Sequence, residues 1–151
     1  MHKRPQELFL VDILVGIDRI NRNAAKLSFE KFFSDENIFN ATTREFSMIG
    51  EAAKHLLDNP SFVRESDTEW RKIVDFRNLI THNYFGVIPK MVFEIIHEDV
   101  PKLEKDILNL INRKKDRSDI LQAIADTKEE LTTLNRRESV AYLEKIEKIL
   151  K

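Results

Sequence analysis

The sequence predicts an all-α protein: an antiparallel helical bundle with a helical hairpin as its C-terminal extension. Apolar residues recur at helical spacing throughout the 151-residue chain, and no stretch alternates as a half-buried strand would. Composition agrees, because the chain has only three Gly and four Pro while charged residues make up 34%. A chain of this length can bury a sizeable core as one domain, or as one domain with an appendage.

Two long helices and a short turn are expected before residue 60. The first helix is predicted over 6–26 and the second over 38–57, each with one apolar stripe. Asp58-Asn59-Pro60 ends the second helix, because proline disfavours helical geometry in the residue before it. The turn at 28–33 is expected to bury its three aromatic side chains, Phe29, Phe32 and Phe33.

A third helix and a fourth helix follow. The third is expected to begin after an N-cap at Asp67 or Thr68. A short connection at 83–87 leads to Pro89, which suits the first turn of the fourth helix. Pro101 is expected either to kink the fourth helix, or to end it and start a continuation.

The chain changes character after residue 112, so we predict a bundle of residues 1–112 and an extension of residues 113–151. A charged break at 113–117 precedes two amphipathic helices, for which Ser118 and Ser139 are the expected N-caps. Each helix carries an apolar stripe that must be buried. The bundle and another chain are both candidate partners, and the sequence leaves the two open.

Composition also narrows the functional classes. The absence of cysteine excludes disulfides and thiolate nucleophiles and suits a reducing cytosol. The charged N-terminus and the lack of an apolar run near ~20 residues predict a cytoplasmic protein without signal peptide or membrane segment. With a net charge of −1, RNA would have to bind a local basic patch. His2, His55 and His97 lack metal-ligand spacing, so we expect neither a metal nor a cofactor.

The most informative segment is the motif Arg-x4-His-x-Tyr, formed by Arg77, His82 and Tyr84 where a helix runs out into a loop. On an ideal helix Arg77 and His82 lie ~140° apart around the axis. If the helix relaxes after Thr81, the imidazole can swing back towards the guanidinium. A permanent cation, a group that titrates near neutral pH and a phenol would then surround an anion, for which a phosphodiester is an obvious candidate.

Four segments together resemble the HEPN superfamily, specifically the HepT-type toxins. They are the Ile-Gly-Glu-Ala helix within 46–54, the run 70–78 that leads into the motif, the motif itself with Phe85-Gly86-Val87 after it, and the acidic–Leu–Pro segment 98–103. The resemblance covers roughly residues 8–110. Phe93 departs from it where Trp is common, and Asn83 departs where a small or acidic residue is common; neither touches the expected chemistry.

The resemblance implies a homodimer with two Arg/His motifs facing a shared cleft. It also implies a metal-independent endoribonuclease that is the toxin of a type VII-like toxin–antitoxin pair. The antitoxin would be a cognate minimal nucleotidyltransferase that neutralises the toxin by adenylylating Tyr84.

The expected roles follow from the chemistry of RNA cleavage. His82 is the candidate general acid or base, and Arg77 would stabilise negative charge that grows on the non-bridging oxygens. Asn78 would support them by orienting His82 or a phosphate, although it could equally cap locally. Three basic residues that flank the motif are weaker candidates for RNA binding: Arg71, Lys72 and Lys90.

Each of these residues also has a purely structural interpretation. Arg77 could pair with a carboxylate such as Asp75, His82 could satisfy carbonyl groups at a helix end, and Tyr84 could be a buried aromatic. Glu51 is expected to serve helix packing or a dimer contact. At the level of the whole chain, the alternatives are a non-catalytic substrate- or partner-binding subunit of a nucleotidyltransferase, or a structural dimerisation module.

Overall fold

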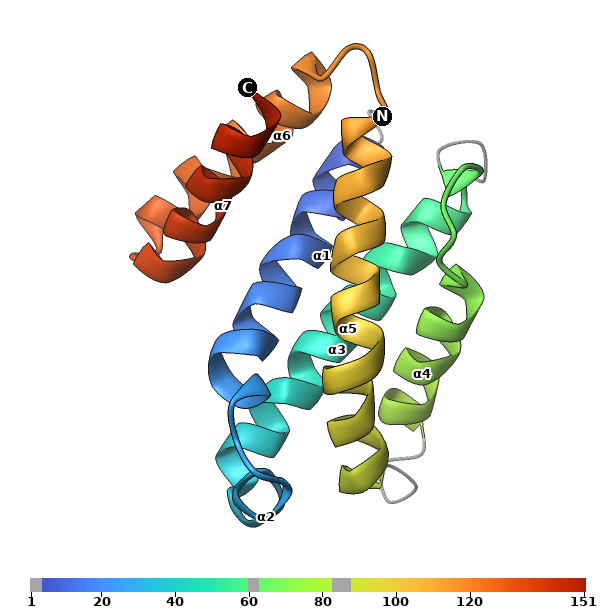
Figure 1. Cartoon of the computed structure of the whole chain (residues 1–151), viewed down its shortest axis with the longest axis vertical. Coiled ribbons are helices and arrows are strands. Elements are labelled where there is room, and N and C mark those ends of the chain that lie inside the picture. The colour runs from blue at the N-terminus through green and yellow to red at the C-terminus, as the bar shows by residue number, and fades with distance from the viewer. Residues whose placement is uncertain (1–3, 60–62, 83–87) are drawn as a thin grey trace.

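A computed structural model describes residues 4–59, 63–82 and 88–151, and within these ranges the chain is entirely helical apart from its connections (Figure 1). The elements are α1 Gln6–Ile20, the π-helical turn η1 Asn21–Ala25, α2 Phe29–Ser34, α3 Glu36–Leu57, α4 Trp70–His82, α5 Pro89–Asn112, α6 Ser118–Thr133 and α7 Arg137–Leu150. The all-α prediction is confirmed. None of the helices in the described part of the chain is long and apolar enough to cross a membrane.

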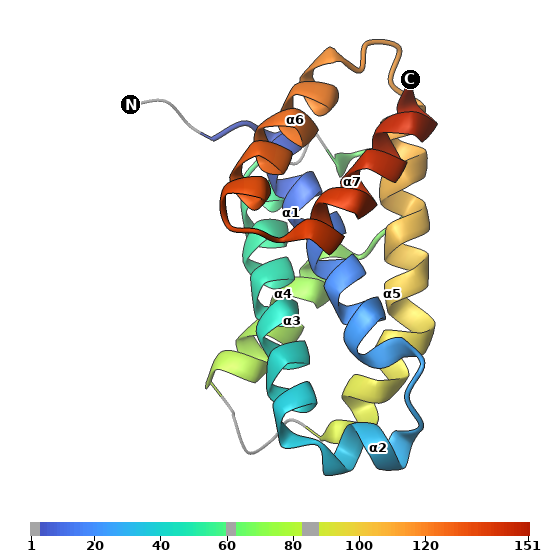
Figure 2. The same cartoon turned by 90° about the vertical axis from the view of Figure 1, so that its left-hand side faces the viewer.

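Helix α1 is the centre of the core. From Phe9 to Ile17 only Asp12 escapes full burial, so this helix is apolar on nearly all sides. Such a helix must be covered from several directions, and α3, α5, α6 and α7 all pack against it (Figure 2). Helix α4 packs mainly on α3, and the short helix α2 packs on α3 and α5.

Two side-chain caps decide where the helices α2 and α3 begin. The hydroxyl oxygen of Ser28 accepts a hydrogen bond from the Lys31 amide at 3.2 Å, so the predicted turn is a short helix. Asp35 Oδ1 accepts from the Ile38 amide at 3.1 Å, which starts α3 two residues earlier than predicted. Phe32 is fully buried as expected, but Phe29 is 37% and Phe33 61% exposed, because a helix directs its side chains to different sides.

The start of α4 differs from the prediction. The helix begins at Trp70, and the two residues predicted as N-caps bond to another helix instead, Asp67 through its backbone amide and Thr68 through its hydroxyl. Asp106 of α5 accepts hydrogen bonds from the Ser66 hydroxyl at 2.5 Å, from the Asp67 amide at 3.2 Å and from the Thr68 hydroxyl. This carboxylate therefore ties the beginning of α4 to α5.

Helix α5 passes through Pro101 without ending, so the second of the two alternatives at this proline is wrong. A proline removes the hydrogen bond to the carbonyl four residues earlier. Pro101 lies on the exposed side of α5, where water can satisfy that carbonyl, while its neighbour Val100 is buried. The helix can therefore continue to Asn112.

The hairpin of α6 and α7 packs on α1 of the same chain, which decides between the two partners left open for its apolar stripes. Its buried apolar residues are Ile120, Ala123, Ile124, Leu131, Leu143, Ile146 and Leu150. The predictions that Ser118 and Ser139 cap these two helices are wrong. Helix α6 begins at Ser118 itself. Helix α7 begins at Arg137, and Ser139 is a buried residue that faces α1.

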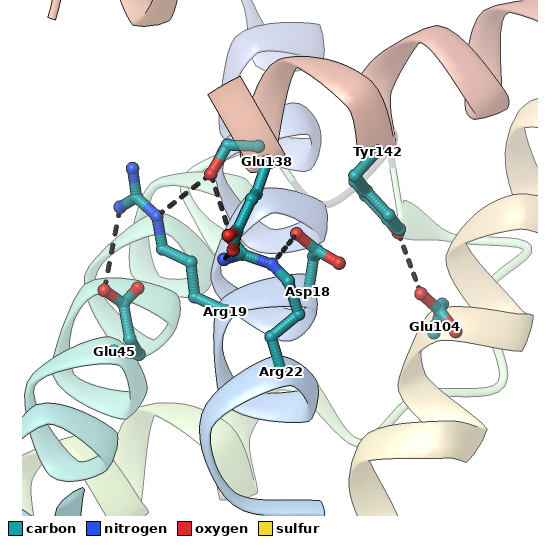
Figure 3. A network of polar contacts seen from close by, with 8 residues as sticks. Asp18, Arg19, Arg22, Glu45, Glu104, Glu138 and Tyr142 are labelled. Carbon is teal, nitrogen blue, oxygen red and sulfur yellow. Dashed lines mark hydrogen bonds and ion pairs between the residues drawn. The ribbon is translucent and has the colours of Figure 1, made fainter. Parts of the chain in front are cut away.

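Polar side chains connect the hairpin to the bundle at two points (Figure 3). Ser139 Oγ accepts from Arg22 Nη2 at 3.2 Å and from Arg19 Nε at 3.4 Å, and Arg22 also pairs with Glu138. Further along α7, the hydroxyl of Tyr142 donates to Glu104 Oε2 at 2.8 Å. We call these contacts the hairpin clamp.

Candidate functional site

Helix α4 carries Arg77 at its closest approach to α3. A Cβ atom placed on Gly50 of α3 would lie 2.1 Å from Arg77 Cβ and 2.7 Å from its Cγ. Both distances are too short for carbon atoms that are not bonded to each other. Only glycine therefore allows the two helices to meet at this point. The contact holds the stem of Arg77 against α3, and the Arg77 side chain is 25% exposed.

Two polar side chains contact the Arg77 guanidinium. Nη2 lies 2.9 Å from Glu51 Oε2 across the helix border, and Nη1 donates to Asn78 Oδ1 at 3.1 Å. Arg77 thus forms an ion pair, as the structural interpretation expected, but with Glu51 of α3 and not with Asp75. Asn78, which was expected to orient His82 or a phosphate or to cap locally, contacts the Arg77 guanidinium.

Sequence reasoning missed Glu51 as a partner of Arg77. The signal was present, because Gly50-Glu51 places a carboxylate directly after the small residue at which another helix can approach. What the sequence did not reveal is that α4 makes this approach with Arg77.

His82 is the last residue of α4, so the chain is still helical after Thr81. The condition under which the imidazole could swing back towards Arg77 is therefore not met. Arg77 and His82 therefore remain about 140° apart around one axis and about 7.5 Å apart along it. His82 is exposed and shares a solvent-facing stripe with Arg71, Asp75 and Asn78. Helix α4 by itself does not bring the guanidinium and the imidazole together.

The other predicted site residues are spread around α4. Tyr84 lies outside the described residues. Arg71 and Lys90 are exposed, and the Lys72 ammonium pairs with Glu69 Oε2 at 2.8 Å. The hydrogen bond with Glu69 and the charge of that carboxylate raise the pKa of Lys72, so it stays cationic.

A groove of about 700 Å³ opens between α4 and α5, above the α3 side chains Phe46 and Ile49. Its walls are mainly apolar, and charged residues, among them Lys72 and Asp106, stand at its rim. Arg77, Asn78 and His82 do not line it. The groove and the motif are therefore separate features of α4. Among the described residues, no three His, Asp or Glu side chains gather as a metal site would require.

Comparison with known proteins finds a family that matches most of this chain. The family described as Ribonuclease HepT-like matches residues 13–110. A Methanocaldococcus jannaschii protein named "Putative RNase MJ1380" is 30% identical over 107 residues, which cover 71% of this chain and 97% of the relative. "Putative RNase TTE0752" of Caldanaerobacter subterraneus is 32% identical over 109 residues, 71% of this chain and 95% of the relative.

A third relative carries the family name itself. "Probable ribonuclease HepT" of Thermococcus cleftensis is 31% identical over 103 residues, covering 68% of this chain and 92% of the relative. The family match ends at residue 110, before α6 and α7 begin. No solved structure matches the chain.

Proposed function

This chain belongs to the ribonuclease HepT-like family, which supports an endoribonuclease activity, and we propose that Arg77 and His82 carry that activity without a metal. The observation behind the proposal is the seating of Arg77. Gly50 lets α3 hold the stem of this arginine, while its side chain stays partly exposed.

Arg77 suits the charge that develops during cleavage. Attack of a ribose 2′-oxygen on phosphorus increases the negative charge on the two non-bridging oxygens. A guanidinium stays protonated at any working pH and offers N–H groups in a plane that matches those oxygens. A residue already held by its stem loses little freedom when it binds the transition state. The expected product carries a 2′,3′-cyclic phosphate, and DNA resists because it lacks the attacking hydroxyl.

His82 is proposed as the group that accepts or donates the proton. Its exposure at the end of α4 makes the imidazole accessible to RNA. One chain, however, offers Arg77 and His82 on different sides of the same helix. This supports a homodimer in which two copies of α4 face a shared cleft, so that residues of both copies surround one phosphate. Arg71 lies on the same stripe as His82 and could contact the RNA backbone there, while Lys72 and Lys90 are further candidates.

The biological role that fits is the toxin of a toxin–antitoxin pair. We propose that a cognate minimal nucleotidyltransferase adenylylates Tyr84. The added nucleotide would place bulk and negative charge beside the expected position of the RNA phosphate. Inhibition would then follow from steric exclusion and from repulsion between like charges.

The test is expression of the wild type alone, beside Arg77→Ala and His82→Ala. Each purified protein is then incubated with total RNA in EDTA. We expect growth arrest and cleavage from the wild type only, with a loss of about 100-fold or more in either variant. Arg64→Ala is a matched control, because Arg64 is an exposed arginine outside the motif.

Two further measurements make a negative result decisive. Circular dichroism establishes that each variant is folded, and mass spectrometry establishes whether Tyr84 is modified. Intact RNA with folded, unmodified wild type would overturn the ribonuclease proposal. A harmless protein that binds a nucleotidyltransferase would favour the non-catalytic subunit instead.

A further inference from the structure

Glu51 contacts two basic side chains at once. Its Oε2 lies 2.9 Å from Arg77 Nη2, and its Oε1 lies 3.7 Å from His55 Nε2, one helical turn further along α3. No role was expected for His55 from the sequence. The carboxylate therefore links the proposed catalytic arginine to a second imidazole, apart from that of His82.

The contact between Glu51 and Arg77 is an ion pair without the alignment of a hydrogen bond. Glu51 Oε2 is shielded from solvent and yet has no hydrogen-bond donor among the described residues. Arg77 can therefore turn N–H groups towards a phosphate without breaking an aligned bond to Glu51. What opposes a phosphate here is the negative charge of the carboxylate.

The position of His55 is set from α1. Its ring stacks on Phe9 with centroids 4.5 Å apart and an interplanar angle of 7°. The Arg4 guanidinium lies 4.8 Å from the centre of the same Phe9 ring, and its charge is matched by Asp12 at 2.7 Å. The charged groups in contact with His55, or with the Phe9 ring on which it stacks, are thus Glu51 and Arg4, and Arg4 is paired with Asp12. Lys54 and Asp58 flank His55 along the chain.

These charges define two states of the cluster. With a neutral imidazole, Arg77 and Glu51 cancel, and the cluster has no net charge. With a protonated imidazole its net charge is +1, which matches the single negative charge of a phosphodiester. An imidazolium is also compatible with the Phe9 ring, because an aromatic face attracts cations.

We propose that Glu51 and His55 are positioning residues that control whether Arg77 accepts an RNA phosphate. Glu51 holds the guanidinium in place, and a proton on His55 offsets the charge that Glu51 adds. The site then binds RNA more tightly when the His55 imidazole is protonated than when it is neutral. This inference rests on the proposed function, because it assigns Arg77 to phosphate binding.

The test is fluorescence anisotropy with a labelled, fully 2′-O-methylated RNA oligonucleotide, which cannot be cleaved because its 2′-oxygen has no proton to lose. We expect wild-type affinity to rise about fivefold from pH ~8 to pH ~6, the upper range for exposed charge pairs. His55→Gln should lose this part of the pH dependence. His55→Phe should lose it too while keeping the stack on Phe9. His97→Gln, which removes a histidine on α5, should behave as the wild type.

Glu51→Gln separates positioning from general damage. Without the carboxylate charge, the oligonucleotide should bind at pH ~8 about as tightly as the wild type does at pH ~6. With cleavable RNA, KM should fall while kcat also falls, because Arg77 loses the partner that holds it. A merely structural role for Glu51 would weaken binding and raise KM.

The outcomes distinguish this inference from the ribonuclease proposal. The inference would be overturned if both His55 variants bound RNA with the pH dependence of the wild type, or if folded Glu51→Gln bound RNA more weakly at pH ~8. Neither result would contradict the ribonuclease proposal. Wild type that shows the His55-dependent binding but cuts no RNA would support the inference and overturn the nuclease. Absence of binding at both pH values would overturn the inference, while the cleavage assay with ordinary RNA would still decide the ribonuclease proposal.

Discussion

Arginines in two regions of this molecule contrast in how they are held. In the hairpin clamp, Arg22 contacts Asp18, Glu138 and Ser139, so its guanidinium is engaged by α1 and α7 together. At the border of α3 and α4, Arg77 has one carboxylate from another helix and its own neighbour Asn78. The first arrangement fixes two elements to each other. The second leaves donor capacity at the surface, as a binding site requires.

Burial also shifts the pKa values of side chains around the hairpin clamp. Beside the clamp, burial raises the pKa of Glu45, although the positive charges of Arg19 and Arg44 oppose the shift. Burial likewise raises the pKa of the Tyr142 phenol far above its usual value, and the charge of Glu104 adds to the effect. Tyr142 therefore remains a hydrogen-bond donor at any working pH. The clamp should stabilise the fold, and the α3–α4 border should serve activity.

The largest effect on stability is expected from Leu143→Ala in α7. Leu143 is fully buried, so its truncation leaves a cavity and should cost about 3 kcal/mol of unfolding free energy. Cleavage by the folded protein should stay at the wild-type rate. Chemical denaturation measures the loss, with Ile149→Ala, at a residue that is 59% exposed, as the control. A change in cleavage rate without unfolding would mean that the hairpin acts on the site.

Gly50→Ala tests the other region. The added methyl group collides with Arg77 Cβ, so α3 and α4 must separate, at an expected cost of about 2 kcal/mol. Unlike Leu143→Ala, it should also lower cleavage, because Arg77 moves. Denaturation and RNA cleavage are measured together, with Ser47→Ala on the same helix as the control. Wild-type activity in this variant would contradict the proposed seating of Arg77.

Asp106→Asn probes the attachment of α4 to α5. Burial by itself would raise the pKa of Asp106, but hydrogen bonds from Ser66, Thr68 and the backbone amides outweigh it and lower the pKa. A lowered folded-state pKa stabilises the fold above the usual aspartate value near ~4. This stabilisation is lost as the pH falls through the lowered value. The variant should therefore lose about 1–2 kcal/mol of unfolding free energy at neutral pH. Its unfolding free energy should also fall less steeply than that of the wild type as the pH is lowered.

Denaturation from neutral pH down to pH ~2 checks this prediction. Asp126→Asn is a suitable control, because Asp126 is an exposed carboxylate on α6. If the stability of Asp106→Asn falls in acid as steeply as that of the wild type, the pH dependence of stability belongs to other carboxylates.

The smallest effect is expected from Tyr142→Phe, which removes only the hydroxyl that donates to Glu104. A hydrogen bond to a charged acceptor at a partly buried site suggests a loss of about 1 kcal/mol. Cleavage should not change, since the clamp is separate from Arg77. Thermal denaturation of the variant, beside a Glu104→Gln variant that keeps an acceptor, measures the effect. Equal stability of Tyr142→Phe and wild type would show that the bond to Glu104 adds nothing to the stability of the fold.

Much of the fold could be predicted because it depends on local rules. Helical spacing, few glycines and the turn signals at Asp58-Asn59-Pro60 and Pro89 located the long helices to within a few residues. Errors occurred where a side chain serves a distant partner. Ser139 and Thr68 are residue types that often cap helices, but their hydroxyls bond to Arg19 of α1 and Arg22 of η1, and to the Asp106 carboxylate. Asp67 meets the same carboxylate through its backbone amide.

The sequence by itself determined an all-α chain, the position of Arg77 and His82 at the end of one helix, and a family resemblance over the part before the hairpin. Tertiary structure decided that the hairpin packs on α1 of its own chain, that Glu51 and not Asp75 pairs with Arg77, and that α4 stays helical through His82. Helical periodicity states which side of a helix is apolar. It does not state which other helix will cover that side, because the choice depends on contacts between residues far apart in the chain.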